Sequence, residues 1–367
     1  MNLENIVSPT LILDKKKCLN NIRLMAEKAK KHNLIFRPHF KTHQSRIIGR
    51  WFKKFGVDKI TVSSLQMAEY FSNDDWKDIT VAFPVNIREI ETINSLAEET
   101  QLNLTLENVE SVEFLSKELK FEVGFFIKID TGYGRTGVSF DIFLLIDKIL
   151  KSSSTCNKLV FKGFLSHSGH AYNAKDTTEI IDIHKDAIHK LTLLKQQYID
   201  KYPELIMSIG DTPTCSLADD FSEINEIRPG NFIFYDLMQN KLGSCNFNQI
   251  ATVLACPVVA KHKDRKEIII HGGGIHFSKD FLRIEDKKVF GKLVLLNKKG
   301  WEETEQDFYL TKLSQEHGTL QVTSDLFNEI NIGGLIGIIP VHACLTANLM
   351  KDYLSTDDEI IDHFSGK

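Results

Sequence analysis

The sequence predicts a (β/α)₈ barrel followed by a smaller, mainly β domain. Short β-rich apolar runs alternate with longer amphipathic stretches up to about residue 236, the pattern of βαβ units around a parallel sheet. After about residue 244 helical periodicity nearly disappears, and strand-like runs separated by turns take over. The 367 residues also exceed the size at which one hydrophobic core usually stops growing, so two domains are expected.

The barrel is predicted from eight candidate strands and the helices between them. The strands are residues 34–39, 59–63, 79–83, 102–106, 123–130, 161–167, 205–209 and 231–236. Stretches between them space their apolar residues at three and four, as a helix packed on a sheet must, in residues 15–31, 66–73, 87–98, 138–151 and 177–198. An eightfold alternation of this length is typical of the barrel fold.

The mainly β domain is predicted from strand-like runs at residues 250–259, 267–271, 288–296 and 307–310. A further strand-like run, residues 9–13, precedes the first helix and can join either part. We therefore place the barrel at residues 14–244 and the β domain at residues 245–367, together with residues 1–13.

Composition excludes several classes of protein. A net charge of -4 and a charged fraction of 26% give no sign of a nucleic-acid partner. No apolar stretch approaches the roughly 20 residues of a membrane span, and the start shows no signal peptide, so we expect a cytoplasmic protein without membrane contact. The six cysteines are scattered and contain no C-x-x-C pair, which predicts free thiols.

Reactive side chains should gather at the carboxyl ends of the barrel strands. The first strand runs into Arg37, His39, Lys41 and His43, which period-two alternation would place on one face. A solvated edge strand is the alternative, but the run begins in apolar residues. A lysine crowded by cations has a lowered pKa, which suits it to form a Schiff base. We expect Lys41, with His39 and His43, to carry the catalysis.

Other predicted strand ends add polar groups. Arg135 lies in a glycine-rich loop after strand five, although a plain βα turn would also explain those glycines. His167 and Tyr172 follow strand six. Gly210, Thr212 and Thr214 follow strand seven, where barrel phosphate sites recur, and a simple helix N-cap is the alternative there. Lysine, arginine and a phosphate cradle across one barrel mouth fit pyridoxal phosphate.

At these residues the chain resembles the alanine-racemase-like, fold-type III pyridoxal-phosphate enzymes, in particular the branch of D-threonine aldolase and D-serine dehydratase. The resemblance covers nearly the whole chain and rests on several motifs in the order of the family. They are Ser8-Pro9-Thr10-Leu11, Arg37-Pro38-His39-Phe40-Lys41-Thr42-His43, the loop of residues 130–137, residues 210–214, Arg228-Pro229-Gly230, Gln315-Glu316-His317-Gly318 and Pro340-Val341-His342-Ala343-Cys344.

The resemblance implies roles for several residues of the cofactor site. Lys41 forms the Schiff base with the cofactor, Arg135 contacts the pyridine nitrogen and Tyr172 lies beside the ring. Gly210, Thr212 and Thr214 hold the phosphate, and we place His167 and Tyr235 with the cofactor-binding residues. The family often has serine or glycine where this chain has Asp211, an acid that is unfavourable beside a phosphate unless it turns away. A homodimer is also implied.

A metal pair is predicted in the β domain. His342 and Cys344, spaced by two on a strand, would point the same way, and imidazole with thiolate is a good zinc donor set. Alone, a His-x-Cys pair is weak, but here it falls where the family places its divalent metal. The resemblance associates His-x-Cys with D-serine dehydratases, and His-x-Asp with D-threonine aldolases.

The leading hypothesis is therefore a pyridoxal-phosphate- and zinc-dependent lyase acting on D-β-hydroxy amino acids. D-serine is the most favoured substrate and would give pyruvate and ammonia. Retro-aldol cleavage to glycine and an aldehyde is the closest alternative. An amino-acid racemase, or a non-catalytic pyridoxal-phosphate carrier, is less favoured.

Overall fold

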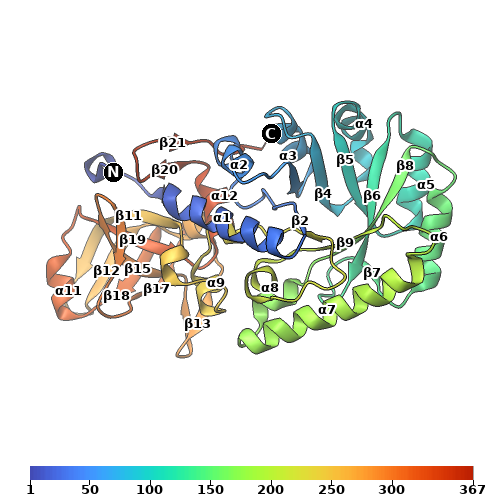
Figure 1. Cartoon of the computed structure of the whole chain (residues 1–367). Helices are drawn as coiled ribbons and strands as arrows, with labels where there is room; N and C mark the ends of the chain where they lie inside the picture. The colour runs from blue at the N-terminus through green and yellow to red at the C-terminus, as the bar shows by residue number, and fades with distance from the viewer. Residues whose placement is uncertain (367) are drawn as a thin grey trace.

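The computed structural model describes residues 1–366, which form a parallel barrel and an antiparallel β domain lying side by side (Figure 1). Eight parallel strands make the barrel, in the order β2-β10-β9-β8-β6-β5-β4-β3. A parallel bridge between His39, in the segment after β2, and Thr61 of β3 connects the two ends of that order. The strands are β2 (Ile35–Phe36), β3 (Lys59–Val62), β4 (Asp78–Pro84), β5 (Gln101–Leu106), β6 (Val123–Asp130), β8 (Leu159–Ser166), β9 (Ile206–Ile209) and β10 (Glu226–Ile227). The predicted fold class is confirmed.

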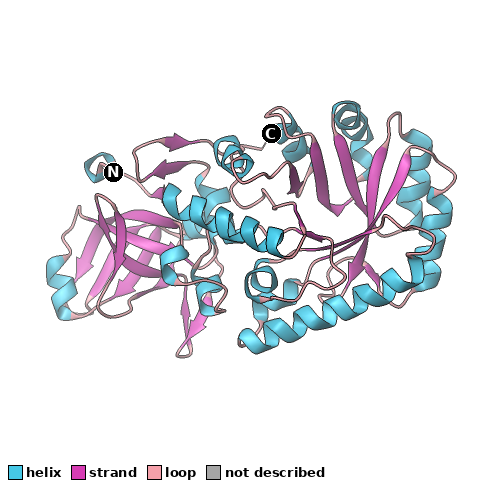
Figure 2. Cartoon of the chain, viewed as in Figure 1, coloured by secondary structure: helices cyan, strands magenta, loops and turns pink. Residues whose placement is uncertain are grey.

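Amphipathic helices surround the barrel strands (Figure 2). They are α1 (Lys15–Lys31), α2 (Arg46–Lys53), α3 (Leu65–Ser72), α4 (Ile90–Glu99), α5 (Val109–Glu118), α6 (Phe143–Ser153), α7 (Thr177–Tyr198) and α8 (Thr212–Leu217). Helix α1 shows why they form: Asp14 caps its first turn, and Cys18, Ile22, Met25 and Ala29 make a buried stripe at helical spacing. Within residues 1–366, no helix combines the length and the apolar character needed to cross a membrane.

The predicted eighth strand is wrong. Residues 231–236 begin with a 3₁₀ turn, and the eighth strand is β10, five residues earlier. Pro229 lacks the N–H that a strand ladder needs. The apolar Phe232 and Phe234 that suggested a strand are both buried, but they point into the core from the turn. As a result, strand eight ends at Ile227, directly before Arg228, and not at Asp236.

The predicted helix at residues 138–151 begins later than expected. Val138–Ser139 forms a short strand, β7, which pairs with β6. Helix α6 starts only at Phe143. The apolar spacing continues across this boundary, so periodicity alone could not locate it.

The β domain is built on a ring of six antiparallel strands. Around the ring the order is β11-β12-β18-β17-β15-β19, and β19 pairs again with β11. Their bounds are β11 (Thr252–His262), β12 (Glu267–His271), β15 (Gly291–Asn297), β17 (Tyr309–Leu313), β18 (His317–Gln321) and β19 (Leu335–Pro340). The smaller pieces are β13 (Leu282–Ile284), β14 (Lys287–Val289), β16 (Gly300–Glu303), α9 (Leu237–Lys241), α10 (Gly274–Phe277), α11 (Ser324–Glu329) and α12 (Ala343–Met350).

Both ends of the chain join this sheet. Strand β1 (Thr10–Leu13) pairs antiparallel with β11 and parallel with β20 (Tyr353–Ser355), and β21 (Ile360–Ile361) pairs with β20. The strand-like run at residues 9–13 therefore lies in the β domain sheet.

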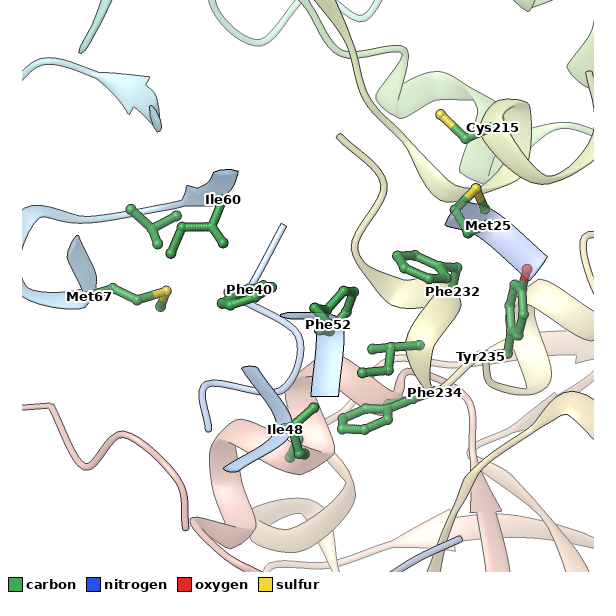
Figure 3. Close-up of a cluster of buried hydrophobic side chains, with 14 of the residues drawn as sticks. Met25, Phe40, Ile48, Phe52, Ile60, Met67, Cys215, Phe232, Phe234 and Tyr235 are labelled. Atoms are coloured by element: carbon green, nitrogen blue, oxygen red, sulfur yellow. The ribbon is translucent and has the colours of Figure 1, made fainter. Parts of the chain in front are cut away.

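A continuous core joins the two parts. Figure 3 shows Phe40, Phe52, Phe232 and Phe234 in one buried cluster beside Met25 of α1. The Phe40 and Phe52 rings lie 5.0 Å apart, and the Phe52 and Phe232 rings 6.2 Å apart. Phe234 also packs against Tyr353 of β20, with ring centres 5.6 Å apart, so this close-packed cluster connects the loop that carries Lys41 to the β domain.

Candidate active site

A pocket of about 500 Å³ opens at the carboxyl ends of the barrel strands and is lined by both domains. The sequence-predicted site residues that line it are His39, Lys41, Arg135, His167, Tyr172, Gly210, His342 and Cys344. The lining does not include His43, Thr212, Thr214 or Tyr235. The predicted metal pair and the predicted cofactor lysine thus share one cavity.

Lys41 reaches the pocket from the lysine loop, by which we mean residues 37–45. Its side chain lines the pocket and is exposed there, although the surrounding protein removes much of the water around the amine. The pKa of the Lys41 amine is lowered, chiefly by burial and further by the charges of Arg135 and Arg228, against the opposing charge of Cys344. A lowered pKa provides more of the neutral amine, which is the form that can act as nucleophile and base.

His39 lines the pocket beside this lysine. Burial, and then the nearby charge of Lys41, hold the pKa of His39 well below its usual range. His167 is similar: burial first, and then Lys41, lower its pKa to about 3. Both imidazoles are therefore neutral at pH 7, so neither adds a positive charge beside the Lys41 amine.

The expectation that four basic side chains share one face is wrong, because β2 ends at Phe36 and the alternation stops there. Arg37 instead makes ion pairs with Glu226 and Asp78, 2.7 and 2.5 Å away. His43 is fully buried with its ring 4.4 Å from that of Phe40, and burial lowers its pKa to about 3. The structure therefore places His43 in the aromatic core and not in the pocket.

Two features at the start of α8 fit an anion such as a phosphate. The Thr212 hydroxyl is buried and has no hydrogen-bond partner, so it is free to donate to a ligand. A Cβ at Gly210 would stand 2.9 Å from the Cβ of Arg228, so only glycine lets the backbone take this path. Tyr172 is also engaged here, because its hydroxyl accepts a hydrogen bond from the Thr212 amide at 3.2 Å.

Asp211 turns back onto its own helix. Its two carboxylate oxygens accept hydrogen bonds from the amide and the hydroxyl of Thr214, both at 2.7 Å. Asp211 is thus the N-cap of α8, and Thr214, predicted to hold a phosphate, has both donors engaged by Asp211. Burial raises the pKa of Asp211 to about 6.

This raised pKa predicts an unusual dependence of stability on pH. The folded-state pKa is about 6 and the ordinary value is 3.8, so between these values the folded protein binds more protons than the unfolded chain. Wild-type stability should therefore fall as pH rises from about 4 to about 6. Asp211→Asn keeps a capping oxygen but does not titrate. Over this pH range we therefore expect the free energy of unfolding of the wild type to fall by up to roughly 3 kcal/mol relative to this variant.

Urea unfolding of the cofactor-free proteins at pH 4.5 and 7.5 measures that difference. Asp357→Asn, at an exposed acid near the C-terminus, is the control and should show no such change. A difference between wild type and Asp211→Asn that is the same at both pH values would contradict the raised pKa.

The two arginines of the pocket differ in burial. Arg135 is exposed at the mouth, with its guanidinium 4.8 Å from the Tyr133 ring centre. Arg228 is buried and fixed by hydrogen bonds of 2.6 Å to the Ser208 hydroxyl and to the Ser166 carbonyl. Sequence analysis named Arg228 only within the Arg228-Pro229-Gly230 motif, because the eighth strand was predicted after it and not before it.

His342 and Cys344 meet at the start of α12. Strand β19 ends at Pro340, so the pair does not lie on a strand as predicted; His342 precedes the helix and Cys344 is in its first turn. The two side chains are nevertheless in hydrogen-bond contact. The Cys344 sulfur also lies 3.3 Å from the hydroxyl of Thr42, the residue next to Lys41.

The electrostatics of this pair suit a metal. Burial raises the pKa of the Cys344 thiol, but the hydrogen bond and charge of His342 outweigh it and the net pKa is lowered, which favours the thiolate. His342 Nδ1 contacts the Asp280 carboxylate at 2.7 Å. A carboxylate behind a histidine is the usual support of a metal ligand, and with Nδ1 engaged by Asp280, Nε2 is the ring nitrogen that faces Cys344.

Asp236 positions the metal pair from behind, a role that sequence reasoning missed. This buried carboxylate accepts hydrogen bonds from the Ala343 and Gln239 amides, both at 3.0 Å, and from the Asn231 side chain at 2.6 Å. It therefore ties the first turn of α12 to the turn after β10. Tyr235, its neighbour, is a core residue whose hydroxyl lies 3.2 Å from that of Ser216 in α8.

A second group of possible metal donors lies in the β domain. Ligand atoms of His271, His276 and Glu316 all lie within 4.8 Å of one another. However, the Gly273 amide donates to His276 Nδ1 at 3.1 Å, which places the proton of the neutral ring on Nε2. In this arrangement His276 has no lone pair left for a metal, so the group is not prepared as a metal site.

Two known protein families match separate parts of the chain. Residues 13–237 match the family described as alanine racemase, N-terminal domain. Residues 251–356 match the family described as putative serine dehydratase domain.

Individual relatives align over almost the full length. The chain is 29% identical to a D-serine dehydratase of Dictyostelium discoideum, covering 99% of this chain and 97% of that protein. The structure of D-threo-3-hydroxyaspartate dehydratase from Delftia sp. HT23 superimposes with a TM-score of 0.90 at 23% identity, covering 99% of both chains. A D-threonine aldolase from Filomicrobium marinum gives a TM-score of 0.83 at 19% identity, with coverages of 98% and 96%.

Proposed function

The chain belongs to the alanine racemase N-terminal domain family. We propose that it is a pyridoxal-phosphate- and zinc-dependent lyase that converts D-serine to pyruvate and ammonia. The contact between Cys344 and Thr42 carries this proposal, because it sets the metal pair beside the cofactor lysine. The similarity to the D-serine dehydratase of Dictyostelium discoideum supports the choice of substrate.

The residues present fit pyridoxal phosphate. Lys41 offers an amine of lowered pKa for the Schiff base, and the unpartnered Thr212 hydroxyl and the bare backbone at Gly210 would hold the phosphate. When bound, the cofactor accepts the electrons released at Cα. We place Arg228 and not Arg135 at the pyridine nitrogen, because Arg228 is the arginine fixed inside the pocket. A guanidinium there leaves the nitrogen unprotonated.

The residues present also fit zinc. His342 and Cys344 would bind it, and two protein ligands leave positions for water and for the substrate hydroxyl. Zinc supplies Lewis acidity that makes the β-hydroxyl a better leaving group. Asp280 orients His342 for this task, and Asp236 fixes the turn that carries both ligands.

The protein's own groups then move the protons. The neutral amine of Lys41 removes the Cα proton of D-serine, and the neutral imidazoles of His39 and His167 keep extra charge away from that amine. Loss of the β-hydroxyl as water leaves an enamine, and hydrolysis of its imine tautomer gives pyruvate and ammonia. The homodimer implied by the resemblance stays a prediction. Measuring the molar mass of the protein in solution tests it.

Product analysis tests the proposed reaction. Purified protein with pyridoxal phosphate and zinc is incubated separately with D-serine and D-threonine, and a chelated sample serves as control. We expect pyruvate from D-serine, lost on chelation. Glycine and acetaldehyde from D-threonine without pyruvate from D-serine would replace the proposal with an aldolase. L-serine formed despite the chelator would replace it with a racemase.

A further inference from the structure

The C-terminal segment, residues 353–364, holds the backbone of the lysine loop. The hydroxyl of Tyr353 donates to the His43 carbonyl at 2.7 Å, and the Phe364 amide donates to the Gln44 carbonyl at 2.6 Å. Tyr353 is itself fully buried. The loop that presents Lys41 is therefore fixed by residues about three hundred positions later in the chain.

Asp362 makes the densest contact of this segment. Its carboxylate accepts four hydrogen bonds, from the Ser45 hydroxyl at 2.7 Å, the Arg46 and Ile47 amides at 3.0 and 3.1 Å, and the Tyr70 hydroxyl at 2.5 Å. The two amides open helix α2 and would otherwise lack an intrahelical partner. A carboxylate in this place stabilises the helix start directly after the lysine loop.

The loop needs such support because its backbone is strained. Gln44 adopts a φ of +47°, which residues other than glycine rarely adopt. Its side-chain amide is shared between the Lys41 carbonyl and the Asn348 side chain, both at 3.2 Å. Strained residues of this kind persist only where surrounding contacts over-determine them.

We propose that Asp362 is a positioning residue for Lys41. By holding Ser45 and the first turn of α2, it fixes the end of the lysine loop, and the strained Gln44 passes that constraint to the Lys41 carbonyl. The inference rests on the proposed function only in taking Lys41 as the cofactor lysine. Misplacing a reacting group by about 1 Å can cost roughly 100-fold in rate.

The test compares Asp362→Ala with Asp357→Asn, which removes an exposed charge from the same segment. Hydrogen–deuterium exchange of the cofactor-free proteins reports on the loop without any reaction. In Asp362→Ala we expect the amides of residues 41–47 to exchange at least about tenfold faster while those of β6 and α7 are unchanged. With cofactor and zinc, we expect kcat for D-serine to fall about 10- to 100-fold, with little change in KM.

Tyr70→Phe, which removes one of the four hydrogen bonds, should give a smaller effect of the same kind. Unchanged amide exchange of residues 41–47 in Asp362→Ala would overturn the positioning role. Faster exchange throughout the protein, together with an unaltered kcat per folded molecule, would also overturn it. Failure of wild-type protein to consume D-serine would count against the proposed substrate, while the exchange result would still decide whether Asp362 fixes the loop.

Discussion

Replacing Lys41 with alanine is expected to abolish turnover of D-serine, with a loss of at least about 10⁴-fold. The variant loses both the amine that attaches the cofactor and the base that removes the Cα proton, and general base catalysis alone is typically worth about 10² to 10⁴ in rate. Pyruvate formation at saturating pyridoxal phosphate and zinc measures this loss.

Lys41→Arg tests whether a positive charge at this position is sufficient for activity. It keeps a cation in the pocket but provides no amine for a Schiff base, so it should be as inactive as the alanine variant. Adding a small primary amine such as methylamine should restore part of the activity of Lys41→Ala, because a free amine can replace the missing base. Near-normal activity in Lys41→Ala without added amine would disprove the assignment of Lys41.

Replacing Cys344 with alanine is expected to remove the metal and to lower the rate of D-serine dehydration by about 10²- to 10³-fold. Lewis-acid activation of a leaving group is worth several kcal/mol, and a single remaining imidazole binds zinc weakly. Metal content by atomic emission and pyruvate release are measured on the same samples. His342→Ala should show the same losses of metal and of rate as Cys344→Ala.

Cys156→Ala is the matched control, since Cys156 is a free, half-buried cysteine that does not line the pocket. It should retain one zinc per chain and wild-type activity. Full activity in Cys344→Ala after chelation would exclude metal from the reaction and leave the cofactor chemistry alone to be explained.

Local sequence patterns predicted the fold wherever a single element carried the signal. Helices α1 and α7 lie at the predicted residues, and β6 and β12 match the predicted strands. The misplaced eighth strand shows the limit, because buried Phe232 and Phe234 look the same to a pattern whether they lie in a strand or in a turn. Tertiary packing decided between the two.

The site was predictable where reactive residues stand at strand ends or in motifs. Lys41 was identified in this way, as were His342 and Cys344, although the geometry expected for that pair was wrong. Asp280 and Asp236 could not be predicted, because each acts through a contact made only in the folded chain: Asp280 to His342, 62 positions away, and Asp236 to the start of α12, 107 positions away. Sequence spacing contains no information about such pairs.

We expect Lys41 to carry pyridoxal phosphate at the mouth of the barrel. Reduction of the cofactor-loaded protein with borohydride, followed by peptide mapping, tests it most directly, because reduction makes a Schiff base permanent. We predict a single reduced pyridoxyl adduct on the peptide that contains Lys41. An adduct on Lys128, which also lines the pocket, or no adduct on either lysine, would show that Lys41 is not the cofactor lysine.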